Sequence, residues 1–195
     1  DLEEWNRRFA AARRIPRNGR VVLCVARMYP RKRIGDLLEA AAILRRGIPE
    51  VRVRIVGKGP EWEAVTQSHE RLGLGETVAL LGDVSREQLA DEYVNADVFC
   101  LPSVQEGFGI VFLEAMAAGL PVVACRAAAI PEVVEEGVVG VLVPPRDPPS
   151  LAVAIRDLLA SPERRREMGE AGRRAVTRFT PDRVGGRPLE AGRLV

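Results

Sequence analysis

Four basic side chains crowd the segment that follows the first apolar run of the sequence: Arg27, Arg31, Lys32 and Arg33. Like charges this close repel one another unless an anion or an acidic side chain meets them. Arginine offers a planar fork of donors and lysine a compact charge, and both suit a diphosphate. The cluster therefore predicts a diphosphate-binding loop, with a solvated surface loop as the alternative.

A second segment of interest is 102–121, PSVQEGFGIVFLEAMAAGLP. Glu106 precedes the Gly-Phe-Gly triplet at 107–109, and an apolar helical pattern begins near Ile110. A helix N-terminus that follows glycines presents free N–H groups and the positive end of the helix dipole. This segment therefore predicts an anion site, and we expect Phe108, Phe112 and Met116 to pack rather than to react.

Glu114 lies inside that helical pattern among apolar residues. A carboxylate on so apolar a helix is costly unless it has a partner. Hydroxyl groups of a ribose or another sugar would supply one, as an acid meets ribose in other nucleotide-binding folds. The structural alternative is a salt bridge to an arginine at the edge of the core.

Glycines surround Lys58 in the sequence Gly57-Lys58-Gly59-Pro60. This is not a dinucleotide fingerprint, because Trp62 stands at the third glycine position, and it is not a P-loop, because Lys58 is not followed by Ser or Thr. We expect a glycine turn that lets a ligand approach the backbone.

Metal and nucleophile chemistry have little support. Cys24, Cys100 and Cys125 lie in apolar runs without CxxC spacing, so we expect reduced thiols in the core and no metal site. The one histidine, His69, lies in a polar helical stretch and is expected on a solvated face. A Ser/His/Asp triad cannot be assembled around it.

Composition narrows the function classes further. The 195 residues carry a net charge of +2 and are 47% hydrophobic, which is typical of a globular domain. The near-zero charge argues against nucleic-acid binding, and the acid–arginine mixture at 163–178 indicates a solvated helix face. Apolar runs are far shorter than the ~20 residues of a membrane span, and the first residues lack a secretory pattern. We expect a cytoplasmic protein without a transmembrane segment.

Short apolar runs alternate about six times with amphipathic helical patterns, which predicts an α/β fold. The fold would be a Rossmann-like, doubly wound parallel sheet with helices on both faces. Strands are expected at 20–26, 51–56, 77–81, 97–101, 121–125 and 140–143, and helices at 34–46, 61–72, 85–94, 110–118, 149–160 and 162–179. In such sheets ligands bind outside the carboxyl ends of the strands, where the segments 27–33, 57–60, 82–85, 102–109 and 126–131 would meet.

The order of these segments resembles the donor-binding half of GT-B retaining glycosyltransferases, in the large family with bacterial mannosyl-, glucosyl- and sucrose-type transferases. The residues that carry the resemblance are Arg27-x4-Lys32, Gly57-x-Gly59-Pro60, Gly82-Asp83-Val84, Ala96-Asp97, Pro102-Ser103 and Glu106-x7-Glu114.

The resemblance implies a donor that is a UDP-, GDP- or ADP-sugar and a transfer that retains the anomeric configuration. Arg27 and Lys32 would hold the diphosphate and stabilise it as leaving group without a metal or other cofactor, and Glu106 would face the donor sugar. The remaining donor-binding residues would be Gly57, Gly59, Gly82, Val84, Gly107, Phe108, Gly109, Ile110 and Glu114, with Glu114 on the ribose and the loop 82–84 on the base.

The resemblance also implies a division of the chain. Residues 1–19 would be an interdomain linker with a short helix, 20–179 the nucleotide-sugar-binding domain and 180–195 a C-terminal tail whose first residues, from the Thr180 cap, are helical. The acceptor-binding N-terminal domain would be missing, so the chain alone would be incomplete for catalysis, and any peripheral membrane contact would run through that half. Alternatives are a non-catalytic nucleotide-sugar-binding or interaction module, and another GT-B enzyme such as an epimerase or a phosphorylase.

Three positions depart from the family pattern. Ala128 and Ala129 replace two glycines before Ile-Pro-Glu, and Ala26 stands where the family often has glycine. If either of the paired alanines has a positive φ, the strain costs about 1 kcal/mol or more.

Overall fold

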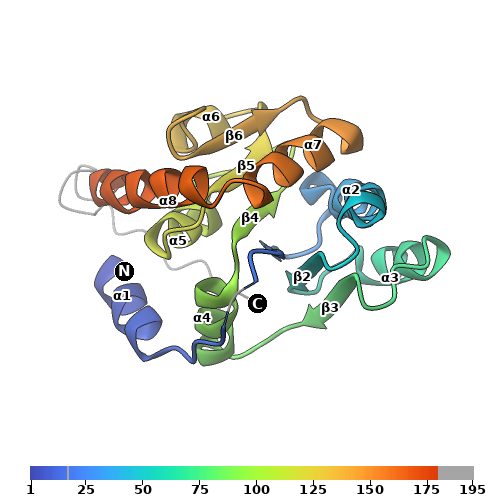
Figure 1. The fold of residues 1–195 in the computed structure, drawn as a ribbon, viewed down its shortest axis with the longest axis horizontal. Coiled ribbons are helices and arrows are strands. Elements are labelled where there is room, and N and C mark those ends of the chain that lie inside the picture. Colours follow the sequence, from blue (N-terminus) through green and yellow to red (C-terminus); the bar gives the residue numbers. More distant parts are fainter. Residues whose placement is uncertain (17, 180–195) are drawn as a thin grey trace.

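The computed structural model describes residues 1–16 and 18–179 (Figure 1). The chain forms one six-stranded parallel sheet in the spatial order β3-β2-β1-β4-β5-β6. The strands are β1 (Val21–Val25), β2 (Arg52–Val56), β3 (Val78–Gly82), β4 (Val98–Leu101), β5 (Val122–Cys125) and β6 (Gly140–Val143). All six strands were expected from the sequence, and the predicted Rossmann-like doubly wound fold is confirmed.

The helices are α1 (Leu2–Ala11), α2 (Ile34–Gly47), α3 (Trp62–Arg71), α4 (Arg86–Asn95), α5 (Ile110–Ala117), α6 (Ile130–Val133), α7 (Pro148–Leu159) and α8 (Pro162–Val176), with 3-10 turns η1 (Pro30–Lys32) and η2 (Thr177–Phe179). The helices α6 and η1 were not expected, because each is too short to show a helical period. The tail from Thr180, including its expected helical start, lies outside the described residues.

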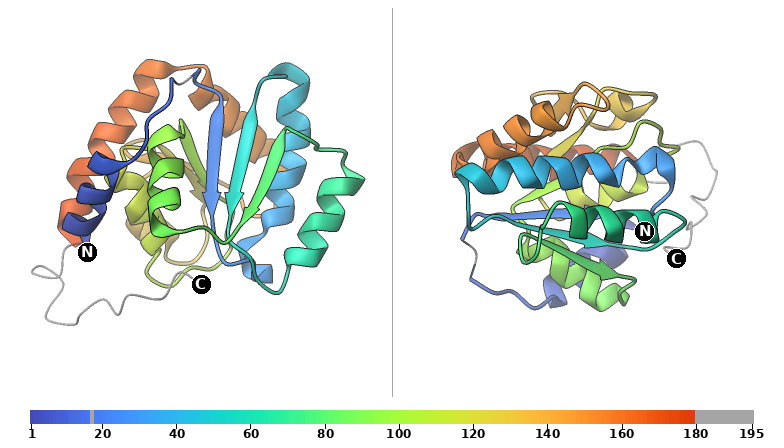
Figure 2. Two further views of the ribbon diagram at one scale, coloured as in Figure 1. Left: turned by 90° about the horizontal axis from the view of Figure 1, so that it is seen from below. Right: turned by 90° about the vertical axis from the view of Figure 1, so that its right-hand side faces the viewer.

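Helices cover both faces of the sheet (Figure 2). On one face α2 packs against α3 and α7, and on the other α1 packs against α4 and α5 while α8 packs against α5. The central strands are apolar on both sides, and their side chains are buried. This double burial explains why the strands appear in the sequence as unbroken apolar runs.

Side-chain caps fix the ends of two predicted helices. Ser85 and Gln88 form a reciprocal capping box at the start of α4, and Ser161 accepts from the Arg164 amide at the start of α8. Both caps were predicted from the sequence. They place the loops that precede these helices.

The strand order reverses between β1 and β4, which pair in parallel with Val22 opposite Val98. In Figure 2 the arrowheads of β1, β2 and β3 point to the same edge of the sheet. Ligands of doubly wound sheets bind at that edge, where the order reverses. The loops that follow β1 and β4 are therefore the ones that shape a site.

Helix α1 is more than a linker, because it packs on the body of the domain. Phe9 is buried, and Trp5 and Phe9 lie with ring centroids 5.7 and 5.8 Å from that of Tyr93 on α4. Tyr93 stacks in turn on Phe99 of β4 at 6.1 Å. An aromatic cluster thus connects the first helix to the centre of the sheet.

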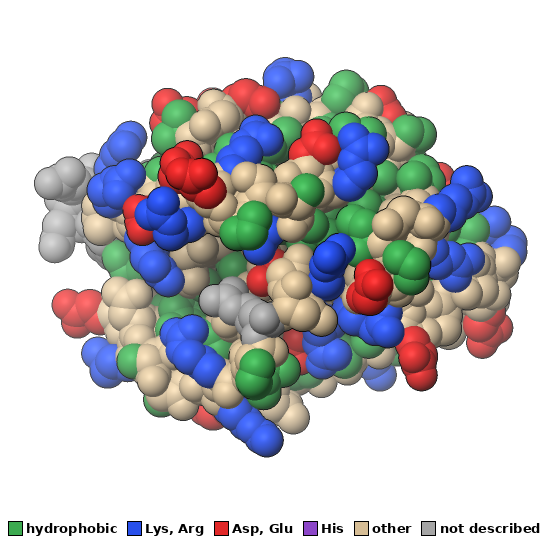
Figure 3. All heavy atoms as spheres, viewed as in Figure 1, with side chains coloured by type: hydrophobic (Ala, Val, Ile, Leu, Met, Phe, Trp, Pro, Cys, Tyr) green, Lys and Arg blue, Asp and Glu red, His purple; other side chains and the backbone are tan. Residues whose placement is uncertain are grey.

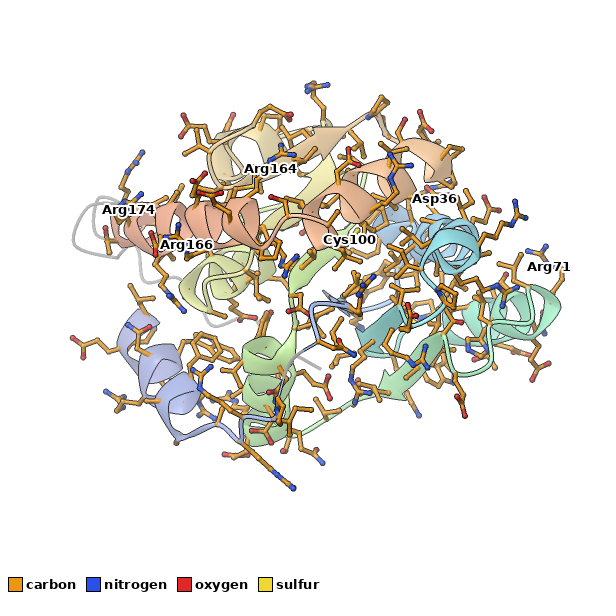
Figure 4. The ribbon with its side chains drawn as sticks, viewed as in Figure 1. Asp36, Arg71, Cys100, Arg164, Arg166 and Arg174 are labelled. Atoms are coloured by element: carbon orange, nitrogen blue, oxygen red, sulfur yellow. The ribbon has the colours of Figure 1, made fainter. Side chains whose placement is uncertain are left out.

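Surface charges are mixed. On the face seen in Figure 3, basic and acidic side chains are interspersed. Arg164, Arg166 and Arg174 come from α8 (Figure 4) and are exposed, and Arg166 lies 3.5 Å from Glu170. The exposure of these arginines confirms the predicted solvated face of α8.

Within residues 1–16 and 18–179, no helix combines the length and the apolar character that crossing a lipid bilayer requires.

Candidate functional site at the switch point of the sheet

Lys32 and Arg33 of the basic cluster pair with acidic side chains. Lys32, in η1, pairs with the carboxylate of Glu106 from the loop after β4. Their side chains are only 11% and 10% exposed. Arg33 makes two 2.9 Å hydrogen bonds to Asp36 in the first turn of α2, which Figure 4 labels. The repulsion expected within the cluster is thereby relieved by one acid from far along the chain and one from nearby.

Arg27 and Arg31 of the same cluster gather around a tyrosine. The guanidinium carbons of Arg27 and Arg31 lie 5.6 and 4.8 Å from the centre of the Tyr29 ring. The Arg27 Nε also donates to the Tyr29 hydroxyl at 3.2 Å. A neutral ring can hold guanidinium groups without cancelling their charge. Tyr29 was not identified from the sequence, although its place between two arginines was a signal.

The loops after β1 and β4 are joined through one backbone carbonyl. The oxygen of Arg31 accepts from the Val104 amide at 2.9 Å and from the Ser103 hydroxyl at 3.2 Å. Ser103 is fully buried. This junction sets the distance between the loop that carries Lys32 and the loop that carries Glu106.

The start of α5 opens to solvent beside this pair. Gly109 caps the helix with a φ of +62°, and an added Cβ would lie 3.0 Å from the Phe112 ring. Gly107 and Ile110 are exposed, and Phe108 is 67% exposed. The expectation that Phe108 packs was wrong, whereas burial of Phe112 and Met116 is confirmed. The helix end is thus reachable by a ligand.

The glycines after β2 and β3 serve close packing between loops. A Cβ at Gly57 would lie 1.9 Å from the Ala26 carbonyl oxygen, and one at Gly59 would lie 2.7 Å from the Met28 nitrogen. Gly57 donates to the Gly82 carbonyl at 2.8 Å. The neighbouring loop thus approaches the backbone of the glycine turn, while a ligand at this turn stays a prediction.

The loop that follows β3 lies beside this junction. Gly82 has a φ of +66°, and an added Cβ would lie 2.9 Å from Lys58 Cε. The Lys58 ammonium lies 4.9 Å from the centre of the Trp62 ring. Val84 is partly buried against the core. Loops from β1, β2 and β3 therefore form one continuous edge.

Glu114 is 5% exposed and faces a tyrosine instead of an arginine. The Tyr93 hydroxyl donates to its Oε2 at 2.8 Å. Burial raises the pKa of Glu114 from 4.5 to about 7, while the bond from Tyr93 counteracts part of that rise. The alternative of a salt bridge to arginine was wrong, and Tyr93 was missed because it lies on a different helix.

Backbone strain marks the loop after β5. Ala128 has a φ of +48°, whereas Ala129 has a φ of −86°. One of the two alanines that replace glycines thus occupies a left-handed conformation, as considered from the sequence.

The three thiols are buried, and the histidine has a backbone partner. Burial raises the pKa of Cys24 to about 12 and of Cys125 to about 11, and it also raises that of Cys100. His69 is half-buried, and its Nε2 lies 2.7 Å from the Val78 carbonyl oxygen, which corrects the expectation of a solvated face. Across the described part of the chain, no three His, Cys, Asp or Glu side chains are grouped to hold a metal ion.

The family follows from comparison with known sequences. The profile of the family described as "Glycosyl transferases group 1" matches residues 6–175. The chain belongs to this family.

Two curated members of the family illustrate the likeness. The chain is 40% identical over 160 residues to the GDP-mannose-dependent α-(1-6)-phosphatidylinositol monomannoside mannosyltransferase of Mycolicibacterium smegmatis, covering 78% of this chain and 42% of the relative. It is 42% identical over 178 residues to the D-inositol 3-phosphate glycosyltransferase of Geodermatophilus obscurus, covering 86% and 39%. The chain thus spans about two fifths of the length of these relatives.

Solved structures of glycosyltransferases share the fold. Sucrose-phosphate synthase from Thermosynechococcus elongatus is 35% identical with a TM-score of 0.78, covering 86% of this chain and 43% of that one. Anabaena HepE, solved with UDP, is 27% identical with a TM-score of 0.75, covering 91% and 48%. The six-stranded unit is therefore the Rossmann-like half of a GT-B glycosyltransferase fold.

Proposed function

We propose that this chain is the donor-binding part of a metal-independent, retaining glycosyltransferase that transfers a hexosyl unit from a nucleoside-diphosphate sugar. The observation that carries the proposal is the buried Lys32–Glu106 pair at the switch point of the sheet. Arg27 belongs to the same loop as Lys32, and Glu106 precedes the open start of α5 by four residues, so cations, a carboxylate and backbone donors come from two joined loops at one edge. That combination suits a sugar joined to a diphosphate.

The cations supply the electrostatic part of the reaction. When the bond from the sugar to the diphosphate breaks, negative charge grows on the leaving phosphate oxygen. Lys32 and Arg27 stabilise that charge, as does the positive end of the α5 dipole through the amides of 107–110. A cation pair of this kind substitutes for a metal ion at the same place.

Glu106 has two roles in this proposal. Its bond to Lys32 holds the ammonium group at the diphosphate position in a largely buried site. Its remaining acceptor capacity faces the donor sugar, where it binds a hydroxyl. The pairing also limits the cost of burying each charge alone.

Glu114 binds the ribose, and the loop with Gly82 and Val84 contacts the base. Gly57 and Gly59 contribute indirectly, because they let the loops after β1 and β2 pack closely. Since the relative from Mycolicibacterium smegmatis is named as GDP-mannose-dependent, we propose a GDP-hexose as the first donor to test. UDP-sugars are the second, because Anabaena HepE was solved with UDP.

The acceptor site lies in a further domain of a longer protein. The chain covers only 42% of its relative from Mycolicibacterium smegmatis. Transfer requires the acceptor oxygen to be held near the sugar carbon, and such positioning contributes about 7–11 kcal/mol to lowering a barrier. A single half of the cleft does not provide it, so the isolated chain binds donor and transfers little. Any contact with a membrane surface runs through that further domain.

The test incubates the isolated chain with GDP-, UDP- and ADP-sugars and a panel of sugar and lipid acceptors, and follows nucleotide release by chromatography. The expected result is donor binding with at most slow hydrolysis. Joining the chain to the N-terminal half of its natural protein should restore transfer, and NMR of the product should show a retained anomeric configuration. Turnover by the isolated chain near one per second, the range of ordinary enzymes, would contradict the half-enzyme proposal. Donor binding that never becomes transfer with both halves present would indicate a binding module.

A further inference from the structure

Tyr93 is packed among three aromatic rings. Its ring contacts Trp5 and Phe9 of α1 and stacks on Phe99 of β4, and its side chain is fully buried. Its hydroxyl donates to Glu114 Oε2 at 2.8 Å. The tyrosine therefore presents its hydroxyl from a fixed place, because its ring is buried and packed among other rings.

The hydroxyl of Tyr93 restricts the orientation of the Glu114 carboxylate. A glutamate side chain has three rotatable bonds, and the carboxylate of Glu114 would sample several orientations without a partner. The bond from Tyr93 engages Oε2, so a ligand hydroxyl is accepted through Oε1. Pre-arranging an acceptor in this way lowers the entropy lost when the ligand binds.

We propose that Tyr93 is a positioning residue for Glu114: it fixes the carboxylate in the orientation that accepts the ribose hydroxyls of the donor. This inference rests on the proposed function, in which Glu114 binds ribose. It assigns to Tyr93 no contact with the donor itself.

The bond also acts on the charge of Glu114. Burial raises the pKa of Glu114 to about 7, and hydrogen bonding from Tyr93 lowers it. Removing the tyrosine hydroxyl should raise the pKa further, so that less of the carboxylate is ionised at neutral pH. An acid that has gained a proton is a poorer acceptor for ribose hydroxyls.

Two further groups among the described residues act on the charge of this pair. The amino group of Asp1, before the start of α1, lowers the pKa of Glu114, and the Cys24 thiol of β1 raises that of Tyr93. From α8, Arg173 donates to the Ala118 carbonyl at the far end of α5. A change in pH dependence on removing the Tyr93 hydroxyl would therefore report on Glu114.

The test is calorimetry of GDP and of 2′,3′-dideoxy-GDP from pH 5.5 to 9 with the unaltered chain, Tyr93→Phe, Glu114→Gln and the double variant. Ser150→Ala is the matched control, because Ser150 also donates a 2.8 Å hydroxyl bond to a carboxylate, that of Asp147 on α7. At pH 7 we expect Tyr93→Phe to weaken GDP binding about tenfold and dideoxy-GDP binding by less than about twofold. In Tyr93→Phe, the pH at which GDP affinity is half of its maximum should be higher than in the unaltered chain.

The double variant distinguishes a positioning effect on Glu114 from a general loss of stability in Tyr93→Phe. In the Glu114→Gln background, Tyr93→Phe should change GDP affinity by less than about twofold, because the group it positions has lost its charge. Equal losses for both nucleotides at every pH, or equal losses in both backgrounds, would overturn the positioning role. An unaltered chain that binds neither GDP nor UDP nor ADP would instead overturn the proposed function.

Discussion

The ammonium group of Lys32 pairs with the carboxylate of Glu106 across the junction of the loops that follow β1 and β4, although the two residues are 74 positions apart in sequence. The bond from Val104 to the Arg31 carbonyl holds the same two loops together. The ion pair and the backbone hydrogen bond therefore fix the position of these two loops relative to each other. The proposed site depends on that position.

Lys32→Ala should weaken nucleoside-diphosphate binding by about 1.5–3 kcal/mol, the usual worth of a hydrogen bond to a charged group. The loss should be this large because Glu106 is left unpaired beside the phosphates. Calorimetry with GDP and with guanosine separates the phosphate contribution, since guanosine binding should hardly change. Lys58→Ala removes the same charge from the next loop and serves as control; an equal effect there would show that only net charge matters.

Glu114→Gln should weaken ribonucleotide binding far more than binding of 2′,3′-dideoxy analogues, because the amide does not replace a carboxylate that accepts two hydroxyls. Parallel titrations with the two analogues measure the difference. Equal affinity changes for both would refute the ribose assignment.

The same substitution should alter the pH dependence of stability. The folded pKa of Glu114 is about 7 against 4.5 in the unfolded chain, so the folded state binds more protons between these values. The unaltered chain must therefore lose stability as pH rises from about 4.5 to 7, by about 3 kcal/mol relative to Glu114→Gln. Urea denaturation of both proteins at pH 5 and pH 8 measures this change, and a constant difference between them would rule out the raised pKa.

Gly57→Ala should destabilise the fold by about 2–4 kcal/mol, because the new Cβ meets the Ala26 carbonyl oxygen and the residue has a φ of +116°. Gly47→Ala is the matched control: that glycine has open space around it and should gain about 1 kcal/mol as a helix residue. Urea denaturation of the two variants gives the comparison. Similar stabilities would mean that the loops after β1 and β2 can separate at little cost.

Ala128→Gly should stabilise the domain by about 0.5–1 kcal/mol, because it relieves a left-handed alanine at φ +48°. Ala129→Gly should destabilise the domain, since Ala129 is at φ −86° and is not strained. Glycine there would only add conformational freedom to the unfolded chain. Thermal denaturation of both variants measures the signs. A loss of stability in Ala128→Gly would show that the strain is compensated by other contacts.

The fold could be predicted from the sequence, and so could the loops that meet at one edge of the sheet, because both depend on local patterns. Apolar runs mark strands that are buried on both faces, and the Ser85 cap marks the start of α4 without any tertiary information. The segments after the strands converge because parallel strands end at one edge.

The partners within the site could not be predicted in this way. Which acid meets Lys32 depends on the pairing of β1 with β4, and which donor meets Glu114 depends on how α4 packs against α5. The glycines at 57 and 59 show the same limit: their sequence predicts a close approach, and only the fold shows that another loop makes it.

The proposed function requires that this edge of the sheet bind a nucleoside diphosphate without a metal. Calorimetry of GDP, UDP and ADP binding to the unaltered chain, in buffer that contains EDTA, tests this requirement. We expect saturable binding of at least one of them, with a dissociation constant between about 1 μM and 1 mM, a free energy of about −8 to −4 kcal/mol. Absence of binding by all three, or binding that appears only when Mg²⁺ is added, would contradict it.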